Sequence, residues 1–144
     1  MPGYRKLQGL EYHYLYDEEV GLLCGGNHPI AVAIKNNTRF TEEDLYQNEL
    51  VYRGYYENDK SKDRKEKFPV GTTCQQTEAV LALVQSGLYL AFCPTYCLEN
   101  MSDEIYEILP ERFHYSSPVY LVVRSDRQQA LLIQEFINVI NTNS

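Results

Sequence analysis

The chain has 144 residues, 44% of them apolar, and a formal net charge of −7. This length and composition are typical of one folded globular domain, and the acidic balance argues against a free-standing nucleic-acid binder, which presents a basic surface. Because residues 1–10 lack the apolar core of a signal peptide and no apolar run reaches the roughly 20 residues that span a bilayer, we expect a cytoplasmic chain without membrane contact.

Residues 11–15 and 20–24 alternate loosely between apolar and polar side chains, which predicts two short strands with the acidic residues 17–19 between them. The Gly-Gly-Asn-His-Pro segment at residues 25–29 then predicts a break, with His28 as a turn residue. Thr41 precedes three acidic residues and is typical of the N-cap of a short helix.

The middle of the chain contains the clearest helix. Apolar residues recur at helical spacing over residues 75–86, with Gly87 at the position of a C-terminal cap. A short strand at residues 50–53 precedes it, and a buried strand at residues 88–92 follows it. The strongly charged stretch at residues 57–67 has mixed signs, which favours a solvated loop or helix over a phosphate site.

A short helix at residues 95–101 and an extended piece at residues 105–109 come next. Residues 118–124 then form a strong strand pattern, and Asp126 is placed to cap a final amphipathic helix that runs to about residue 140. Strands and helices therefore alternate along the whole chain, which predicts an α/β fold with helices packed on the faces of a sheet.

The four cysteines, Cys24, Cys74, Cys93 and Cys97, are expected to be free thiols in a reducing compartment. Cys93 and Cys97 are near each other in sequence, but a structural zinc would need a second pair of ligands. We therefore expect no metal and no cofactor, with a redox pair as the alternative.

Motifs of catalysis are absent from the sequence, since it contains no nucleophile elbow, phosphate loop or dinucleotide-binding turn. His13, His28 and His114 are far apart in sequence, and none has a cysteine at a metal-ligand spacing. The acidic pairs lie where turns and helix starts need charge, and nothing marks them as an acid–base couple. The sequence thus predicts no catalytic residue and no enzyme.

Ligand binding is better supported, because three loops follow strands or open helices, where backbone N–H groups and hydroxyls are available. The candidate ligand-binding residues of these loops are Arg53, Gly54, Tyr55, Tyr56, Cys74, Gln75, Gln76, Thr77, Cys93 and Pro94. Arg53 favours an anionic ligand, and an aromatic ligand is left open. The alternative is that these segments are ordinary loops and caps, which use the same residue types.

Several segments, taken in order, resemble the effector domain of LysR-type transcriptional regulators. They are Tyr4 to Glu19, the His28-Pro29-Ile30-Ala31 element, Thr41-Glu-Glu-Asp-Leu45, Thr77 to Pro94 and residues 118–140. Each motif alone is weak, but the ordered set covers nearly the whole chain.

The resemblance implies a periplasmic-binding-protein-like (type 2) effector domain with the second lobe complete and the first lobe partial. Residues 1–27 would hold the end of the first lobe and the first crossing strand. Residues 28–117 would form the second, effector-binding lobe, and residues 118–144 the return strand and the last helix. The small-molecule effector would lie between the lobes, with Pro2 and Gly3 as a remnant of the opposite wall.

By resemblance, the protein would be an allosteric sensor that forms a homo-oligomer, expected to be a dimer. It would reach DNA only through an N-terminal winged helix-turn-helix that is absent from this sequence. Two alternatives stay open: a fragment of a transport solute-binding protein, and a small enzyme of the same fold.

Overall fold

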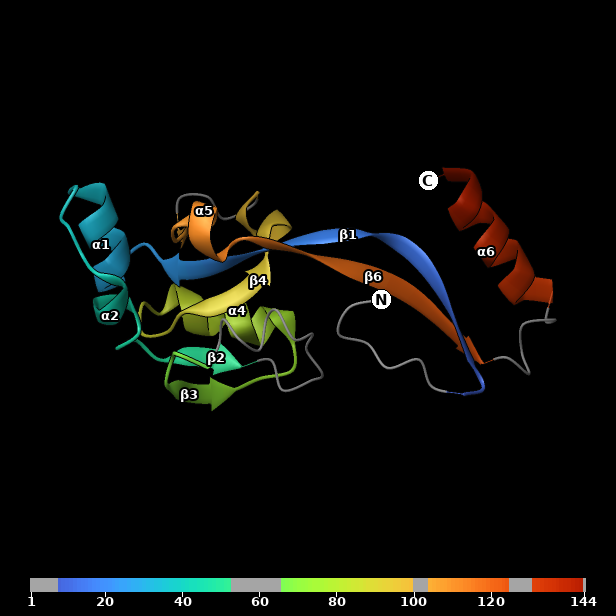
Figure 1. Ribbon diagram of the computed structural model, residues 1–144, viewed down its shortest axis with the longest axis horizontal. Coiled ribbons are helices and arrows are strands. Elements are labelled where there is room, and N and C mark those ends of the chain that lie inside the picture. The colour runs from blue at the N-terminus through green and yellow to red at the C-terminus, as the bar shows by residue number, and fades with distance from the viewer. Residues whose placement is uncertain (1–7, 53–65, 100–103, 125–130, 144) are drawn as a thin grey trace. The chain divides into compact units, whose positions relative to one another are not determined.

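The structure is a computed structural model that describes residues 8–52, 66–99, 104–124 and 131–143 (Figure 1). The strands of these residues are, in chain order, β1 (Leu10–Gly25), β2 (Leu50–Tyr52), β3 (Val70–Thr73), β4 (Ala91–Pro94), β5 (Ile105–Glu107) and β6 (Tyr115–Arg124). The helices are α1 (Pro29–Lys35), α2 (Glu42–Leu45), α4 (Thr77–Gln85), the 3₁₀ helix η1 (Thr95–Leu98), α5 (Pro110–Phe113) and α6 (Leu131–Asn143).

The chain divides into two compact units. Unit 1 contains Glu19–Tyr115, and unit 2 contains Tyr4–Glu18 and Ser116–Ser144, of which residues 8–18, 116–124 and 131–143 are described. The long strands β1 and β6 each contribute residues to both units. The boundaries therefore fall within these two strands, at residues 18/19 and 115/116.

Strand β1 is central to the main sheet of unit 1, where it pairs with β4 on one edge and β5 on the other, both antiparallel. Its register aligns Leu22 with Phe92 of β4 and Leu23 with Glu107 of β5. The last six residues of β1 are all buried, because neighbouring strands cover both edges and side chains cover both faces. Strand β6 also pairs with β1, and β2 and β3 form a separate parallel pair.

The alternation of side chains along the strands divides the core of unit 1 into two hydrophobic clusters. The first contains Leu22 of β1, Phe92 of β4 and Phe113 of α5, together with residues of α1 and α2. The second contains Leu23 of β1 and Val80 of α4. Since successive residues of β1 belong to different clusters, a one-residue register slip would exchange the two faces.

Helix α1 begins with a histidine cap. The imidazole Nδ1 of His28 accepts a hydrogen bond from the backbone N–H of Ile30 at 3.0 Å, and Pro29 fills the first helical position, where no N–H is needed. The His28 side chain is buried, and this burial lowers its pKa from the ordinary value of 6.5. His28 is therefore a helix cap and not only a turn residue, and helix α1 was not predicted, because its seven residues are too few to show a helical period.

Helix α2 begins after the predicted N-cap Thr41, and the structure adds a capping box that was not predicted. The N–H of Asp44 donates to the Thr41 hydroxyl at 3.1 Å, and the N–H of Thr41 donates to the Asp44 carboxylate at 2.9 Å. The predicted α4 helix is also confirmed, and Gly87 follows it with a φ of +81°, which glycine adopts at little cost.

The structure differs from the sequence-based expectations at three further elements, β1, β3 and α5. The two short strands predicted on either side of residues 17–19 are one continuous strand, β1, because pairing with β6 sustains it and Asp17 and Glu19 remain exposed within it. The short elements β3 and α5 were missed, since four residues carry too little periodicity. The predicted cap Asp126 and the charged stretch up to residue 65 lie outside the described residues.

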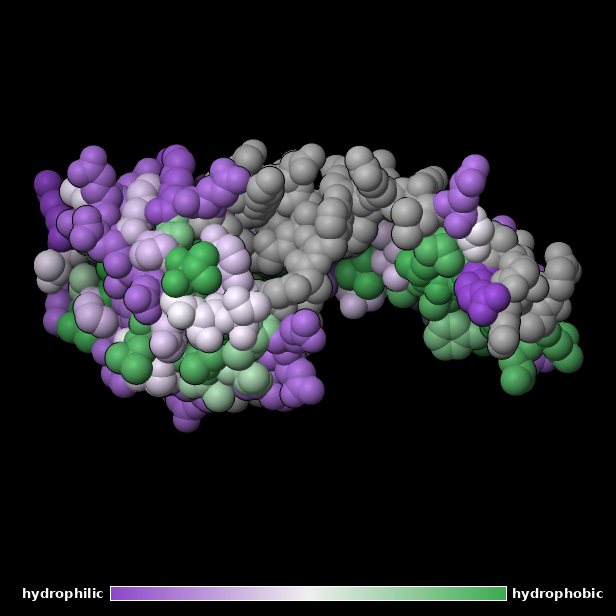
Figure 2. All heavy atoms as spheres, turned by 90° about the horizontal axis from the view of Figure 1, so that it is seen from below, coloured by the Kyte–Doolittle hydropathy of each residue, from purple (hydrophilic) through white to green (hydrophobic). Residues whose placement is uncertain are grey.

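Unit 2 contains the first half of β1, most of β6 and helix α6. Tyr120 of β6 makes edge-to-face ring contacts with Tyr12 and Tyr14 of β1, at centroid distances of 6.3 and 6.0 Å. Several large apolar side chains of α6 are exposed, among them Leu132 and Phe136. Figure 2 shows hydrophobic surface gathered on this part of the chain, at the right of the view.

We predict that His28→Ala lowers the free energy of unfolding by roughly 1 kcal/mol or more, because it removes the cap of α1. In the wild type, the stabilisation from His28 is fully present above its unfolded pKa near 6.5 and is lost as pH falls through the lowered folded value. Urea unfolding followed by circular dichroism at several pH values measures both effects. His28→Asn, which keeps a capping acceptor, is the control; equal stability of the alanine and asparagine variants would contradict the capping role.

Candidate ligand-binding edge of the sheet

The carboxyl ends of three strands lie at one edge of unit 1. β2 and β3 are parallel, with Tyr52 opposite Thr73, and the N–H of Cys74 donates to the carbonyl of Tyr52 at 2.7 Å. Leu50 forms a parallel bridge with Leu90, directly before β4. β2, β3 and β4 therefore run in the same direction and end on the same side. We call this side the strand-end edge; it is formed by the ends of these strands and the segments that follow them.

The segment from Cys74 to the start of α4 presents accessible polar groups at the strand-end edge. Gln75 and Gln76 are exposed, and Cys74 and Thr77 are half-buried. Gln76 is the N-cap of α4 and makes no side-chain capping hydrogen bond. The backbone N–H groups of the first turn of this nine-residue helix are thus placed where a ligand could accept hydrogen bonds from them.

The third predicted loop contributes differently. Cys93 and Pro94 are the last residues of β4, and both side chains are buried. Cys93 packs in the second hydrophobic cluster, with Cys74 at its margin. Contact with a ligand from this loop would therefore come from its backbone or from half-buried Thr95, whose hydroxyl donates to the carbonyl of Glu19 at 3.4 Å.

Arg53, Gly54, Tyr55 and Tyr56 lie outside the described residues, and so do Pro2 and Gly3. The described neighbour Tyr52 ends β2 at the strand-end edge, so the chain enters the Arg53 segment from that edge. The assignment of these residues to a ligand site stays a prediction.

Unit 1 also has surface hollows away from this edge. One of about 530 Å³ is lined by polar side chains, including Lys35, whose ammonium donates to the carbonyl of Gly26 at 2.9 Å. Another, of about 400 Å³, lies between the start of α2 and Leu109 and includes Arg39.

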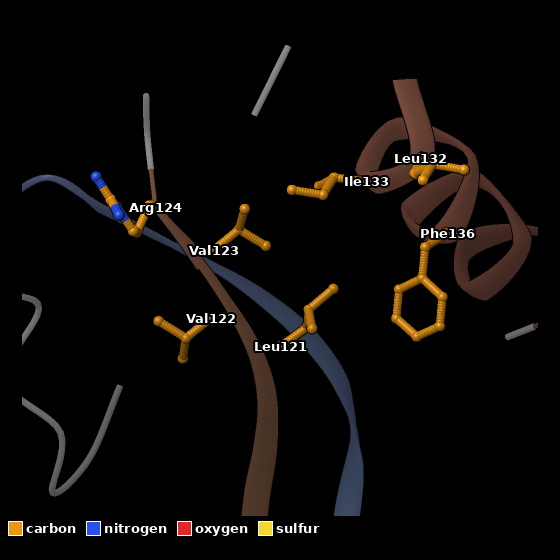
Figure 3. Close-up of a pocket in the computed structure, with 7 residues that line it drawn as sticks. All are labelled: Leu121, Val122, Val123, Arg124, Leu132, Ile133 and Phe136. Atoms are coloured by element: carbon orange, nitrogen blue, oxygen red, sulfur yellow. The ribbon is translucent and has the colours of Figure 1, made fainter. Parts of the chain in front are cut away.

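Unit 2 contains a pocket of about 560 Å³ between β6 and α6, lined mostly by aliphatic and aromatic side chains (Figure 3). In Figure 3, Val123 and Leu121 of the strand and Ile133 of the helix project into the space between the two elements, whereas the guanidinium of Arg124 points away from the helix. None of these residues was predicted to bind a ligand, although the apolar spacing of the last helix predicted an apolar face on one side of the pocket.

A cluster of ionisable side chains in unit 1 was also missed. The ring nitrogens of His114 contact the carboxylates of Glu19 and Glu107, which come from β1 and β5. No sequence signal joins these residues, since their proximity depends on the pairing of β5 with β1 and on the short helix α5. Among the described residues, no group of three or more His, Cys, Asp or Glu side chains is arranged to hold a metal ion.

Comparison with known proteins identifies the family. The sequence model of the LysR substrate binding domain matches residues 2–144. The chain belongs to this family. A curated relative, the HTH-type transcriptional activator BauR of Pseudomonas aeruginosa, is 24% identical over 136 residues, which are 93% of this chain and 44% of BauR. The chain therefore spans less than half the length of that relative.

Solved structures of LysR-type regulators share the fold of this domain. The CrgA regulatory domain of Neisseria meningitidis matches with a TM-score of 0.65 and 18% identity, over 92% of this chain and 68% of that one. The AmpR effector domain of Pseudomonas aeruginosa gives the same TM-score and identity, over 94% and 65%. The expected periplasmic-binding-protein-like α/β fold is thereby confirmed. Within the described ranges, no helix of this LysR-family domain has the length and apolar character needed to span a bilayer.

We predict that Cys74 of the LysR-family domain reacts first with a thiol reagent in the native state, because it is half-buried while the other cysteines are buried. Cys24 should react last, since burial raises the pKa of its thiol to about 12 and little thiolate forms. Mass spectrometry of timed iodoacetamide labelling gives the order. The most rapidly labelled cysteine should be absent in Cys74→Ser. Early labelling of Cys24 would contradict the burial of this thiol at the end of β1.

Proposed function

We propose that this LysR-family domain is an effector sensor, and that a small molecule binds at the strand-end edge of unit 1. The observation that supports the proposal is the parallel alignment of β2 with β3 and with the segment entering β4. Because of this alignment, the segment that begins at Cys74 and the end of β4 at Pro94 lie at one edge. Tyr52, which directly precedes Arg53, lies at the same edge. Ligands of α/β proteins commonly occupy such positions, beyond the carboxyl ends of strands.

The groups at the edge favour a ligand with a carboxylate or another compact anion. Backbone N–H groups at the start of α4 carry partial positive charge and point out of the helix. Thr73, at the end of β3, is exposed and adds a hydroxyl donor. Arg53 would add a guanidinium, which pairs with a carboxylate through two parallel hydrogen bonds. The tyrosines after Arg53 would provide a surface for an aromatic portion.

The proposed sensor leaves its ligand chemically unchanged. A ligand that binds one conformation of the domain more tightly than another shifts the population toward the first. Ligand binding would in this way be coupled to the conformation of the whole regulator. Ligand binding would change how a winged helix-turn-helix domain outside this sequence binds DNA. The relative BauR supports this proposal, because it is described as an HTH-type transcriptional activator.

We further propose that the domain forms a homo-oligomer, expected to be a dimer, through unit 2. The support is the exposed apolar surface of α6, where Leu131, Leu132, Phe136 and Val139 are all exposed. A contiguous apolar patch of this kind is unfavourable in water and typically marks an interface.

We predict that a thermal-shift screen of small organic acids and aromatic acids finds a ligand. At a concentration of 100 times Kd, such a ligand would stabilise the protein by about 2.7 kcal/mol. Arg53→Ala should weaken binding of an acidic hit roughly tenfold to a hundredfold, as expected for loss of a charged hydrogen-bonded contact. Arg39→Ala, in a hollow of the same unit, is the matched control. Equal affinities of wild type and Arg53→Ala would contradict the assignment of Arg53.

We predict that the wild-type domain sediments as a dimer at tens of micromolar, and that Leu132→Lys shifts it toward monomer by placing a charge in the apolar patch. Leu132 is 79% exposed, so the folded subunit tolerates this change. Leu88→Lys, at an exposed position of unit 1, is the control and should leave the dimer intact. A wild-type monomer at this concentration would refute the proposed oligomer.

A further inference from the structure

His114 lies between two carboxylates in unit 1. Its Nδ1 is 2.7 Å from the Glu107 carboxylate oxygen, and its Nε2 is 2.8 Å from the Glu19 carboxylate oxygen. Glu107 ends β5, Glu19 belongs to β1, and His114 directly precedes β6. One imidazole therefore joins three strands.

These distances require a particular protonation state. Both contacts are hydrogen bonds to acceptors, and an imidazole can donate from both nitrogens only when it is protonated. A neutral ring has one N–H, so the lone pair of its other nitrogen would face a carboxylate oxygen. With both carboxylates ionised, the two contacts together are thus satisfied by imidazolium and not by neutral histidine.

The two carboxylates are held unequally. The Glu107 side chain is 18% exposed and lies against Gly21 of β1, where an added Cβ would come within 2.5 Å of its carboxylate oxygen. The absence of a side chain at Gly21 therefore makes room for Glu107. Glu19 is 50% exposed, so water can replace its contact with His114 at small cost.

We propose that His114, Glu19 and Glu107 form a proton-dependent clamp that joins the middle of β1 and the start of β6 to β5. When His114 is protonated, it ties Glu19 of β1 to Glu107 of β5. When the imidazolium releases one proton to solvent, the remaining proton stays on Nδ1 with Glu107, and Glu19 separates from the ring.

The electrostatics of the cluster support the clamp. Hydrogen bonds to Glu107 and then to Glu19 raise the pKa of His114 above its ordinary value of 6.5, against a smaller opposing effect of burial. Arg112, on the same segment, pairs instead with Glu42 of α2. Because the folded pKa is raised, the stabilisation is complete below the unfolded value of 6.5 and is lost as pH rises through the folded value.

The position of the clamp gives it a consequence for the fold. Glu19 is the residue at which β1 enters unit 1, and Tyr115, next to His114, is the residue at which β6 leaves it. In the protonated state, β1 at Glu19 and the start of β6 are both fixed to β5. In the neutral state β1 loses one of its anchors at Glu19, so the mobility of the strand at this residue would increase over the pH range around neutrality.

The test is an NMR titration of the imidazole resonances of the full chain, with His114 assigned by its absence in His114→Gln. The wild-type midpoint should lie above 6.5, and Glu19→Gln and Glu107→Gln should each lower it. The ¹⁵N shifts of the neutral ring should place the proton on Nδ1. The backbone amides of Glu19 and Val20 should titrate with the same midpoint in the wild type and lose that transition in His114→Gln.

Glu11→Gln is the matched control, because it removes a carboxylate beside His13 and should leave the His114 midpoint unchanged. Gly21→Ala tests the geometry without changing any charge, since the new methyl group displaces the Glu107 carboxylate and should lower the midpoint. A wild-type midpoint at or below 6.5, or one unaffected by both glutamine substitutions, would overturn the clamp. A neutral-ring proton on Nε2 would overturn the release of Glu19.

Discussion

The burial of β1 between β4 and β5 is the constraint on which unit 1 depends. Six consecutive residues at the end of this strand are buried, so each backbone polar group there needs a partner in the protein. The antiparallel ladders to β4 and β5 provide such partners, and the ladder to β5 continues in the hydrogen bond from the N–H of Ile108 to the carbonyl of Leu22. Because Leu22 and Leu23 enter different hydrophobic clusters, packing on both faces fixes this register.

The strand-end edge follows from this arrangement. The register of β1 sets the position of β4. The position of β2 follows, because the N–H of Val51 donates to the carbonyl of Leu90, directly before β4, at 2.9 Å. β3 then adds to β2 in parallel. The start of α4 is held against the same strands through Val80, which packs with Val51 and Leu23. A rigid core thus positions a polar edge, which is the arrangement that a binding site requires.

The sequence predicted the elements whose signal is local. Helix α4 has regular apolar spacing and a glycine after its end, and Thr41 and Asp44 form a complete capping box. Periodicity could not predict β3, whose four residues include Gly71 and two threonines, nor the continuity of β1 through its acidic residues, which depends on a partner strand distant in sequence.

The candidate site was predictable in part. Ligand sites of α/β sheets lie beyond the carboxyl ends of strands, so a site formed by the segment after β2 and the start of α4 could be anticipated, although the strand β3 that brings Cys74 beside Tyr52 could not. The burial of the Cys93 and Pro94 side chains could not, because it depends on how α4 packs over β4. The contacts of His114 could not be anticipated either, since they need Gly21 to leave space and the short helix α5 to return the chain to Glu107.

The most direct test of the proposed binding site is an amide chemical-shift map of the domain, recorded while an acidic ligand found by screening is titrated in. The account predicts that the largest changes fall on the amides of Cys74, Gln75, Gln76 and Thr95, at the strand-end edge. Changes centred instead on Lys35, or on Val123 and Ile133 of unit 2, with the strand-end amides unmoved, would contradict it.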